Sequence, residues 1–222
     1  MRQFRQAVSG LIAAAALVAG ISACGAPAYT YAADTTDHAY FKVPAGWLEV
    51  NPLELAVAQV NVLGGTPAGT TGGSFDWVRA YTPAVHPAPT DLLTMSRQPV
   101  VYMSVQNVSQ TLRAELSFDL MRNLLFRVTL SSRQQAEAAG AKLPAFNLIS
   151  DSTITTKDGM RGINELYQYQ IGGQPDTFDQ TVLTNSDTTK LYLLLVQCYQ
   201  SCFLANRAQI AAVIHSFTVR GP

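Results

Sequence analysis

The stretch that decides the fold lies between residues 147 and 198 and contains NLISDSTIT (147–155), GINELYQYQI (162–171), FDQTVLT (178–184) and LYLLLVQC (191–198). These four segments are short and rich in β-branched, aromatic and leucine residues, as β-strands are. Gly172-Gly173 and Asn185-Ser186-Asp187 lie between neighbouring segments and are natural hairpin turns. We therefore expect four consecutive strands that are joined by hairpins into an antiparallel sheet.

Further elements flank this stretch on both sides. Strands are predicted at 39–43 (AYFKV), 47–50 (WLEV), 75–82 (FDWVRAYT) and 99–105 (PVVYMSV). Helices are predicted at 53–63, after the capping Asn51 and Pro52, and at 117–127, 132–139 and 204–215. Because helices occur before, within and after the strand series, we expect an α+β domain whose sheet is covered by helices on at least one face.

The N-terminus has the layout of a bacterial secretion signal. Arg2 and Arg5 precede the uncharged run LIAAAALVAG (11–20), which is too short to span a membrane. Ile21-Ser22-Ala23-Cys24 follows and resembles the lipobox of bacterial lipoproteins, in which the cysteine is acylated and becomes the mature N-terminus. We predict that residues 1–23 are a signal peptide and that Cys24 carries the lipid. The alternative is an ordinary signal peptide that is cut near an unpaired cysteine.

The cysteine count agrees with this interpretation, because an oxidising compartment usually pairs its thiols and this chain has three. With Cys24 acylated, Cys198 and Cys202 remain. A disulfide needs α-carbons within roughly 7 Å, whereas four extended residues span about 13 Å, so the chain must turn between them. We expect a bridge of about 2 kcal/mol that fixes a strand-to-helix corner.

The mature chain is predicted to have a short anchor region and one folded domain. Residues 24–36 form the lipidated N-terminus and a flexible tether that reaches about 40 Å when fully stretched. Residues 37–222 form a single domain, held on the extracytoplasmic face of the cell membrane. Loss of the signal leaves thirteen basic and fifteen acidic residues without a basic cluster, so nucleic acid is not an expected partner.

Motifs that carry chemistry are missing from the sequence. His38, His86 and His215 have no nearby ligand at metal-site spacing, and no GxSxG or HExxH motif occurs. The glycine-rich stretch 64–73 (GGTPAGTTGG) lacks the lysine of a phosphate-binding loop, so it is a flexible connector or a mobile contact loop. We predict no catalytic residues, no metal, no cofactor and no enzymatic activity.

Aromatic residues give a possible binding signal, since Phe75, Trp77 and Tyr81 share one predicted strand and Tyr167 and Tyr169 share another. Residues two apart project from the same face of a sheet. Each set is either packed beneath a helix or lines an apolar pocket or groove for a ligand or partner. The polar elements of such a site would be Asp76, Arg79 and Glu165.

Several short phrases resemble a known fold group. They are FKVPAGW (41–47), FDQTVLT with Leu191-Tyr192, and IHSFTV (214–219). The chain resembles the Mog/PsbP-like group over roughly residues 38–219, and within it the actinobacterial lipoproteins of the LpqN type. This resemblance implies an α/β/α sandwich around an antiparallel sheet, and a host without an outer membrane. It implies no reaction, since members serve as extrinsic subunits, partner-binding adaptors or lipoproteins.

Two functions follow as hypotheses. The first is a non-catalytic surface lipoprotein whose domain binds another envelope protein, which an exposed apolar patch would favour. The second is a tethered carrier or receptor for a small apolar ligand, such as a lipid or a cell-wall intermediate, which an internal cavity would favour. A hydrolase is the third hypothesis, and it would require clustered carboxylates with strongly shifted pKa values.

Overall fold

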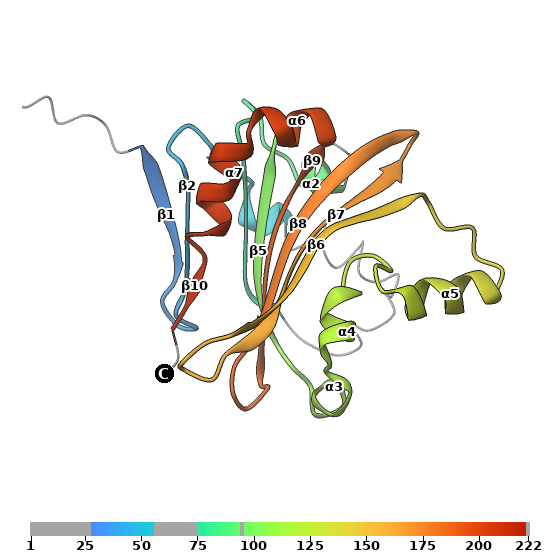
Figure 1. Cartoon of the computed structure of the whole chain (residues 1–222). Coiled ribbons are helices and arrows are strands. Elements are labelled where there is room, and N and C mark those ends of the chain that lie inside the picture. Colours follow the sequence, from blue (N-terminus) through green and yellow to red (C-terminus); the bar gives the residue numbers. More distant parts are fainter. Residues whose placement is uncertain (1–27, 56–74, 94–95, 221–222) are drawn as a thin grey trace, which may run out of the picture.

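The computed structural model describes residues 28–55, 75–93 and 96–220. Its centre is a seven-stranded sheet in which every pair of neighbouring strands is antiparallel (Figure 1). In spatial order the strands are β3 (Leu48–Glu49), β4 (Phe75–Thr82), β5 (Val100–Asn107), β9 (Lys190–Tyr199), β8 (Gln174–Thr184), β7 (Arg161–Ile171) and β6 (Phe146–Thr155). The four consecutive strands predicted from residues 147–198 are confirmed.

Other elements cover the two faces of this sheet (Figure 1). One outer layer combines α6 (Gln200–Ala205) and α7 (Arg207–Ile214) with a small sheet of β1 (Tyr29–Asp34), β2 (Ala39–Pro44) and β10 (Thr218–Val219). The opposite layer contains α2 (Thr90–Leu93), α3 (Gln110–Glu115), α4 (Phe118–Arg122) and α5 (Leu130–Ala138). The predicted antiparallel sandwich is therefore confirmed, with a three-stranded sheet added to one outer layer.

Strand β9 shows why the sequence forms this arrangement. It is the fourth of seven strands, and all residues from Leu191 to Cys198 are buried. A strand covered on both faces needs apolar side chains at successive positions rather than at alternate ones. The run LYLLLVQC meets that need, so it positions the sheet between the two outer layers.

The predicted tether is shorter in the structure, because residues 29–34 form β1 and pair with β2. The hairpin is closed by Asp34, whose Oδ1 accepts a hydrogen bond of 2.9 Å from the backbone N–H of Thr36. Composition alone hides this strand, since YTYAAD has small and weakly polar residues. The prediction of a tether over residues 24–36 is therefore wrong for residues 29–34, and the folded domain begins before residue 37.

Two predicted helices have different bounds. The helix expected at 117–127 begins after the capping Ser117 but ends at Arg122, because Asn123 Oδ1 accepts hydrogen bonds from the N–H groups of Val128 and Thr129. This local turn competes with the helix. The closing helix expected at 204–215 is divided at Asn206 into α6 and α7.

The helix predicted at 53–63 begins at Pro52, and the side chain of Asn51 accepts a hydrogen bond of 3.0 Å from the N–H of Leu53. The rest of that helix, the glycine-rich stretch 64–73, the signal peptide and Cys24 lie outside the described residues. Among the described residues, no helix is long and apolar enough to cross a membrane.

Candidate functional site

The predicted aromatic contact residues belong to the core. A register shift between Phe75 and Trp77 turns Phe75 to the face opposite Trp77 and Tyr81. Trp77 and Tyr81 pack edge-on against Phe41 beneath the small sheet, with ring centroids 6.4 and 5.8 Å from it. The bulge therefore breaks the shared face that alternation predicted.

Tyr167 and Tyr169 do share a face, but it is the one that packs against α4 and residues 124–128. Tyr167 stacks on Phe178 at 5.3 Å, and Tyr169 lies 4.9 Å from Phe126. Both tyrosines are buried. The rings thus pack against each other, which agrees with the first of the two predicted alternatives, packing beneath covering elements, and not with a ligand or partner surface.

The three charged residues proposed beside these rings have different neighbours. Arg79 pairs with Glu49 at 2.9 Å. Asp76 accepts hydrogen bonds from Asn107 and Lys190. Glu165 lies buried under α4 and belongs to a polar cluster.

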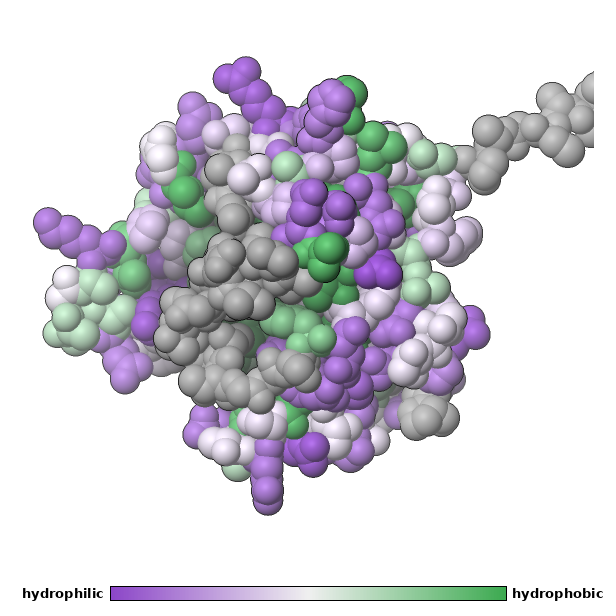
Figure 2. All heavy atoms as spheres, turned by 180° about the vertical axis from the view of Figure 1, so that it is seen from behind, coloured by the Kyte–Doolittle hydropathy of each residue, from purple (hydrophilic) through white to green (hydrophobic). Residues whose placement is uncertain are grey.

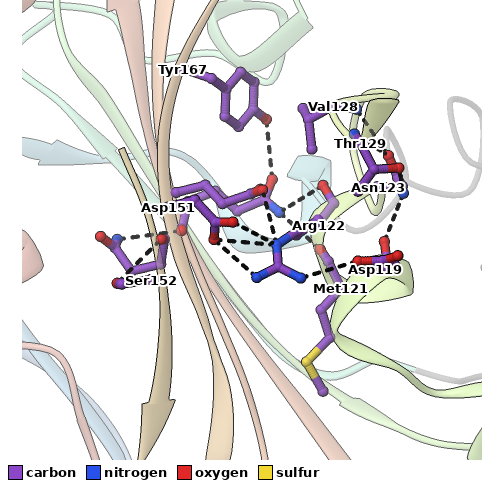
Figure 3. Close-up of polar contacts among 12 residues, drawn as sticks. Asp119, Met121, Arg122, Asn123, Val128, Thr129, Asp151, Ser152 and Tyr167 are labelled. Carbon is purple, nitrogen blue, oxygen red and sulfur yellow. Dashed lines mark hydrogen bonds and ion pairs between the residues drawn. The ribbon is translucent and has the colours of Figure 1, made fainter. Parts of the chain in front are cut away.

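That cluster is built on paired strands and one helix (Figure 3). Glu165 of β7 and Asp151 of β6 are partners in the antiparallel register, so their carboxylates share a face. Arg122 is the last residue of α4, and it lies 3.0 Å from Asp151 and 3.7 Å from Glu165. It also contacts Asp119 of its own helix at 3.1 Å. The guanidinium group of Arg122 therefore lies within ion-pair distance of three carboxyl groups.

Neutral polar side chains fix the same helix end to the sheet. Nε2 of the buried Gln180 donates to the carbonyl oxygens of Met121 and Arg122 at 3.0 and 3.4 Å. Tyr167 Oη donates in turn to Gln180 Oε1 at 3.2 Å. These bonds satisfy carbonyl groups that the end of a helix leaves without intrahelical partners.

The electrostatics of the cluster centre on Glu165, whose side chain is 1% exposed. Burial, together with the charge of Asp151, raises the pKa of Glu165 to about 8, although Arg122 lowers it. Glu165 Oε2 has no hydrogen-bond partner among the described residues. Glu165 is therefore mostly protonated at neutral pH, which lowers the cost of burying it beside Asp151.

This cluster is the kind of feature that a hydrolase would require, namely neighbouring carboxylates with a shifted pKa. Glu165 is covered by α4 and the sheet, however, and a catalytic group must reach the reacting atoms of a substrate. In this structure the cluster instead holds α4 against the sheet edge. Its members come from four separate elements, and Glu165 is the one that the sequence predicts as a polar site element. The helical spacing of Asp119 and Arg122 is a second sequence signal for the cluster.

The edge held by this cluster is β6, a ten-residue strand at the end of the sheet. Nearly all of its side chains are exposed, including Leu148 at 45% and Ile149 at 48%. A register shift at Ile149 interrupts its pairing with β7. The sheet therefore ends in a long strand whose outer side has no neighbouring strand within the described residues.

The predicted disulfide between Cys198 and Cys202 is present, with an α-carbon separation of 6.0 Å. Cys198 lies near the end of β9 and Cys202 lies in α6, so the bridge fixes the expected strand-to-helix corner. No group of three or more His, Cys, Asp and Glu residues within the described ranges is arranged to hold a metal ion.

No protein-family model matches the chain, and no curated protein sequence matches it either. Among solved structures, it is similar to PsbP from the cyanobacterium Synechocystis, with 15% identity, a TM-score of 0.49, and coverage of 91% of this chain and 99% of that one. It is also similar to LpqN, described as involved in cell envelope biogenesis of Mycobacterium tuberculosis, with 11% identity, a TM-score of 0.45, and coverage of 89% and 88%.

A Mog1 variant matches with 8% identity, a TM-score of 0.42, and coverage of 86% of this chain and 95% of that one. The names of these proteins are those of the fold group that the sequence phrases resemble. At such identities and TM-scores, the likeness carries no function to this chain. The lipoprotein type within the group stays a prediction.

Proposed function

We propose that this protein is a lipid-anchored, extracytoplasmic and non-catalytic domain that binds another protein of the cell envelope. Anchoring is supported by the signal-like residues 1–23 and by Cys24. The disulfide between Cys198 and Cys202 fits an oxidising compartment outside the cytoplasm. The two cysteines that would not carry lipid are thereby paired.

The observation that carries the binding function is the exposed edge strand β6. Soluble proteins usually shorten, cover or charge such an edge, because its N–H and C=O groups can pair with a foreign strand. β6 is ten residues long, and its exposed Leu148 and Ile149 add apolar side chains to the edge. An extended segment of a partner would add one strand here and contact these side chains.

Three other observations bear on the choice between the candidate functions. Figure 2 shows the face behind the view of Figure 1, where hydrophobic side chains of the described residues are interspersed with hydrophilic ones. The aromatic rings that a carrier of apolar ligands would use are packed in the core. Glu165, which a hydrolase would need, is buried. Protein binding is the function that these observations support best.

Position-specific cross-linking in intact cells tests this function. A photoreactive amino acid would replace Ile149 on β6, and the matched control would replace Leu204, an exposed leucine on α6. We expect one major protein adduct from position 149 and none from position 204. Equal labelling at both positions, or labelling at neither, would contradict strand addition at β6.

Anchoring is tested separately by replacing Cys24 with Ala. The mature wild-type protein is expected in the membrane fraction with a diacylglyceryl mass at its N-terminus. The variant is expected to lose that mass and to leave the membrane fraction. A wild-type protein without added lipid would contradict anchoring at Cys24. The cross-linking result at β6 does not depend on this outcome.

A further inference from the structure

We infer that the outer face of the small sheet β1-β2-β10 lies against an anionic bilayer surface. This inference rests on the lipid anchor proposed at Cys24 and assigns a second membrane contact that the anchor alone does not require. The occupant of the face is a lipid headgroup layer, and the interaction is carried by tyrosine and basic side chains.

The strand register fixes which side chains point outward. In β1 and β2, Ala32 pairs with Phe41 and both are buried against the core. Side chains at alternate positions point the other way. Tyr31, opposite Lys42, is 76% exposed. The remaining outward side chains of the two strands and β10 include Tyr29, Ala33, Tyr40 and Thr218.

The chemistry of this face is aromatic and basic. Lys42 Nζ lies 4.5 Å from the ring centre of Tyr29, and the guanidinium carbon of Arg220 lies 5.5 Å from that of Tyr40. No acidic side chain belongs to the outward positions that the structure describes on these three strands. Tyrosine is enriched at membrane interfaces, and Lys and Arg near a bilayer are attracted to anionic lipids.

The position of β1 along the chain places this face near the membrane. Five chain steps separate Cys24 from Tyr29, and they span at most about 17 Å. The headgroup region of one leaflet is itself about 5 to 8 Å thick. The longer tether expected from composition would have allowed about 40 Å. Because β1 occupies residues 29–34, the acylated cysteine holds the small sheet within reach of the headgroups.

Fluorescence quenching in vesicles tests the contact with the mature, lipidated protein. Tyr31→Cys carries an environment-sensitive fluorophore, and Leu130→Cys is the control, an exposed residue of α5 in the opposite outer layer (Figure 1). The vesicles contain phosphatidylglycerol, phosphatidylcholine and a lipid with a spin label in its headgroup region. The introduced thiol is the reactive one, because Cys24 is acylated and Cys198 is bridged to Cys202.

We expect at least threefold stronger quenching of the label at position 31 than of the label at position 130. The charge-reversed protein with Lys42→Glu and Arg220→Glu should lose most of this difference. The same loss is expected on vesicles in which phosphatidylcholine replaces the phosphatidylglycerol and the spin-labelled lipid is kept. Both substitutions are at the surface of the small sheet, and near-ultraviolet circular dichroism checks that the fold is kept.

Flotation of the vesicles separates the two ways in which this inference can fail. Protein that does not float with the vesicles contradicts the anchor at Cys24, and the membrane contact fails with it. Protein that floats but shows equal quenching at positions 31 and 130 keeps the anchor and overturns the contact of the small sheet. Quenching at position 31 that charge reversal and lipid charge leave unchanged overturns the role of Lys42 and Arg220.

Discussion

Arg122 of α4 and Asp151 of β6 form a two-point ion pair, in which Nε lies 3.0 Å from Oδ2 and Nη2 lies 3.1 Å from Oδ1. The same guanidinium is 3.7 Å from the buried Glu165. This geometry ties a helix to the strand that ends the sheet, so it connects the stability of the domain to the edge proposed for binding.

Replacement of Arg122 by Ala should lower the free energy of unfolding by about 2 kcal/mol at pH 7, because Asp151 loses its charge partner and α4 loses its two-point link to β6. Urea denaturation measures the change. The control is Arg207→Ala, an exposed arginine at the start of α7, which should stay within about 0.5 kcal/mol of the wild type. Equal losses in both variants would contradict the role assigned to Arg122.

Glu165→Gln should remove a pH dependence of stability. The folded protein keeps a proton on Glu165 up to about pH 8, whereas the ordinary pKa is 4.5, so the wild type loses stability as pH rises between these values. The glutamine variant should match the wild type near pH 5 and exceed it by a few kcal/mol at pH 9.

Urea denaturation of both proteins at pH 5, 7 and 9 gives this difference directly. Asp176 and Asp179, whose pKa values burial raises to about 6, titrate in both proteins and cancel in the comparison. A difference between wild type and variant that does not change with pH would show that Glu165 does not hold its proton in the folded state.

Gly162 of β7 lies very close to the backbone of β8. A Cβ at this position would lie 1.9 Å from the carbonyl oxygen of Val182. Gly162→Ala should therefore force the two strands apart and cost about 3 kcal/mol. Gly46→Ala is the matched control, because no heavy atom lies within 4 Å of its Cβ position. Thermal unfolding curves that coincide for the two variants would disprove the predicted clash.

The double variant Cys198→Ala and Cys202→Ala should lose about 2 kcal/mol of stability, because it frees the corner between β9 and α6. Cys24→Ala should leave the unfolding of the domain unchanged, since Cys24 lies before β1. Intact mass of the oxidised wild type should be about 2 Da below that of the reduced protein. An oxidised mass equal to the reduced one would contradict the bridge.

The sequence predicted the strands better than the helix ends, for physical reasons that particular residues show. The buried run 191–198 is apolar at successive positions, and this pattern predicts a central strand that is covered on both faces. The end of α4 depends instead on Asn123, whose side chain bonds to backbone groups five and six residues later. The sequence did not predict strand β1, because residues 29–34 form a strand through pairing with β2 and not through their own composition.

The candidate site was only partly predictable. Glu165 was recognised as a possible polar element, but its partners Arg122, Asp151 and Gln180 lie far away in sequence and meet only through the sheet register and the packing of α4. The prediction that Phe75 shares a face with Trp77 and Tyr81 is wrong, because a bulge turns the side chain of Phe75 to the other face of the sheet. No local sequence pattern indicates this bulge. Residue spacing predicts a shared face only while the strand stays regular.

The most direct test of envelope-protein binding is the native mass of the mature protein, released gently from membranes and compared with its denatured mass. We predict a complex that is heavier by the mass of a second polypeptide, and its loss when Leu148 and Ile149 on β6 are both replaced by Lys. An added mass of only a few hundred daltons that disappears on denaturation would contradict protein binding, because it would identify the domain as a carrier of a small ligand.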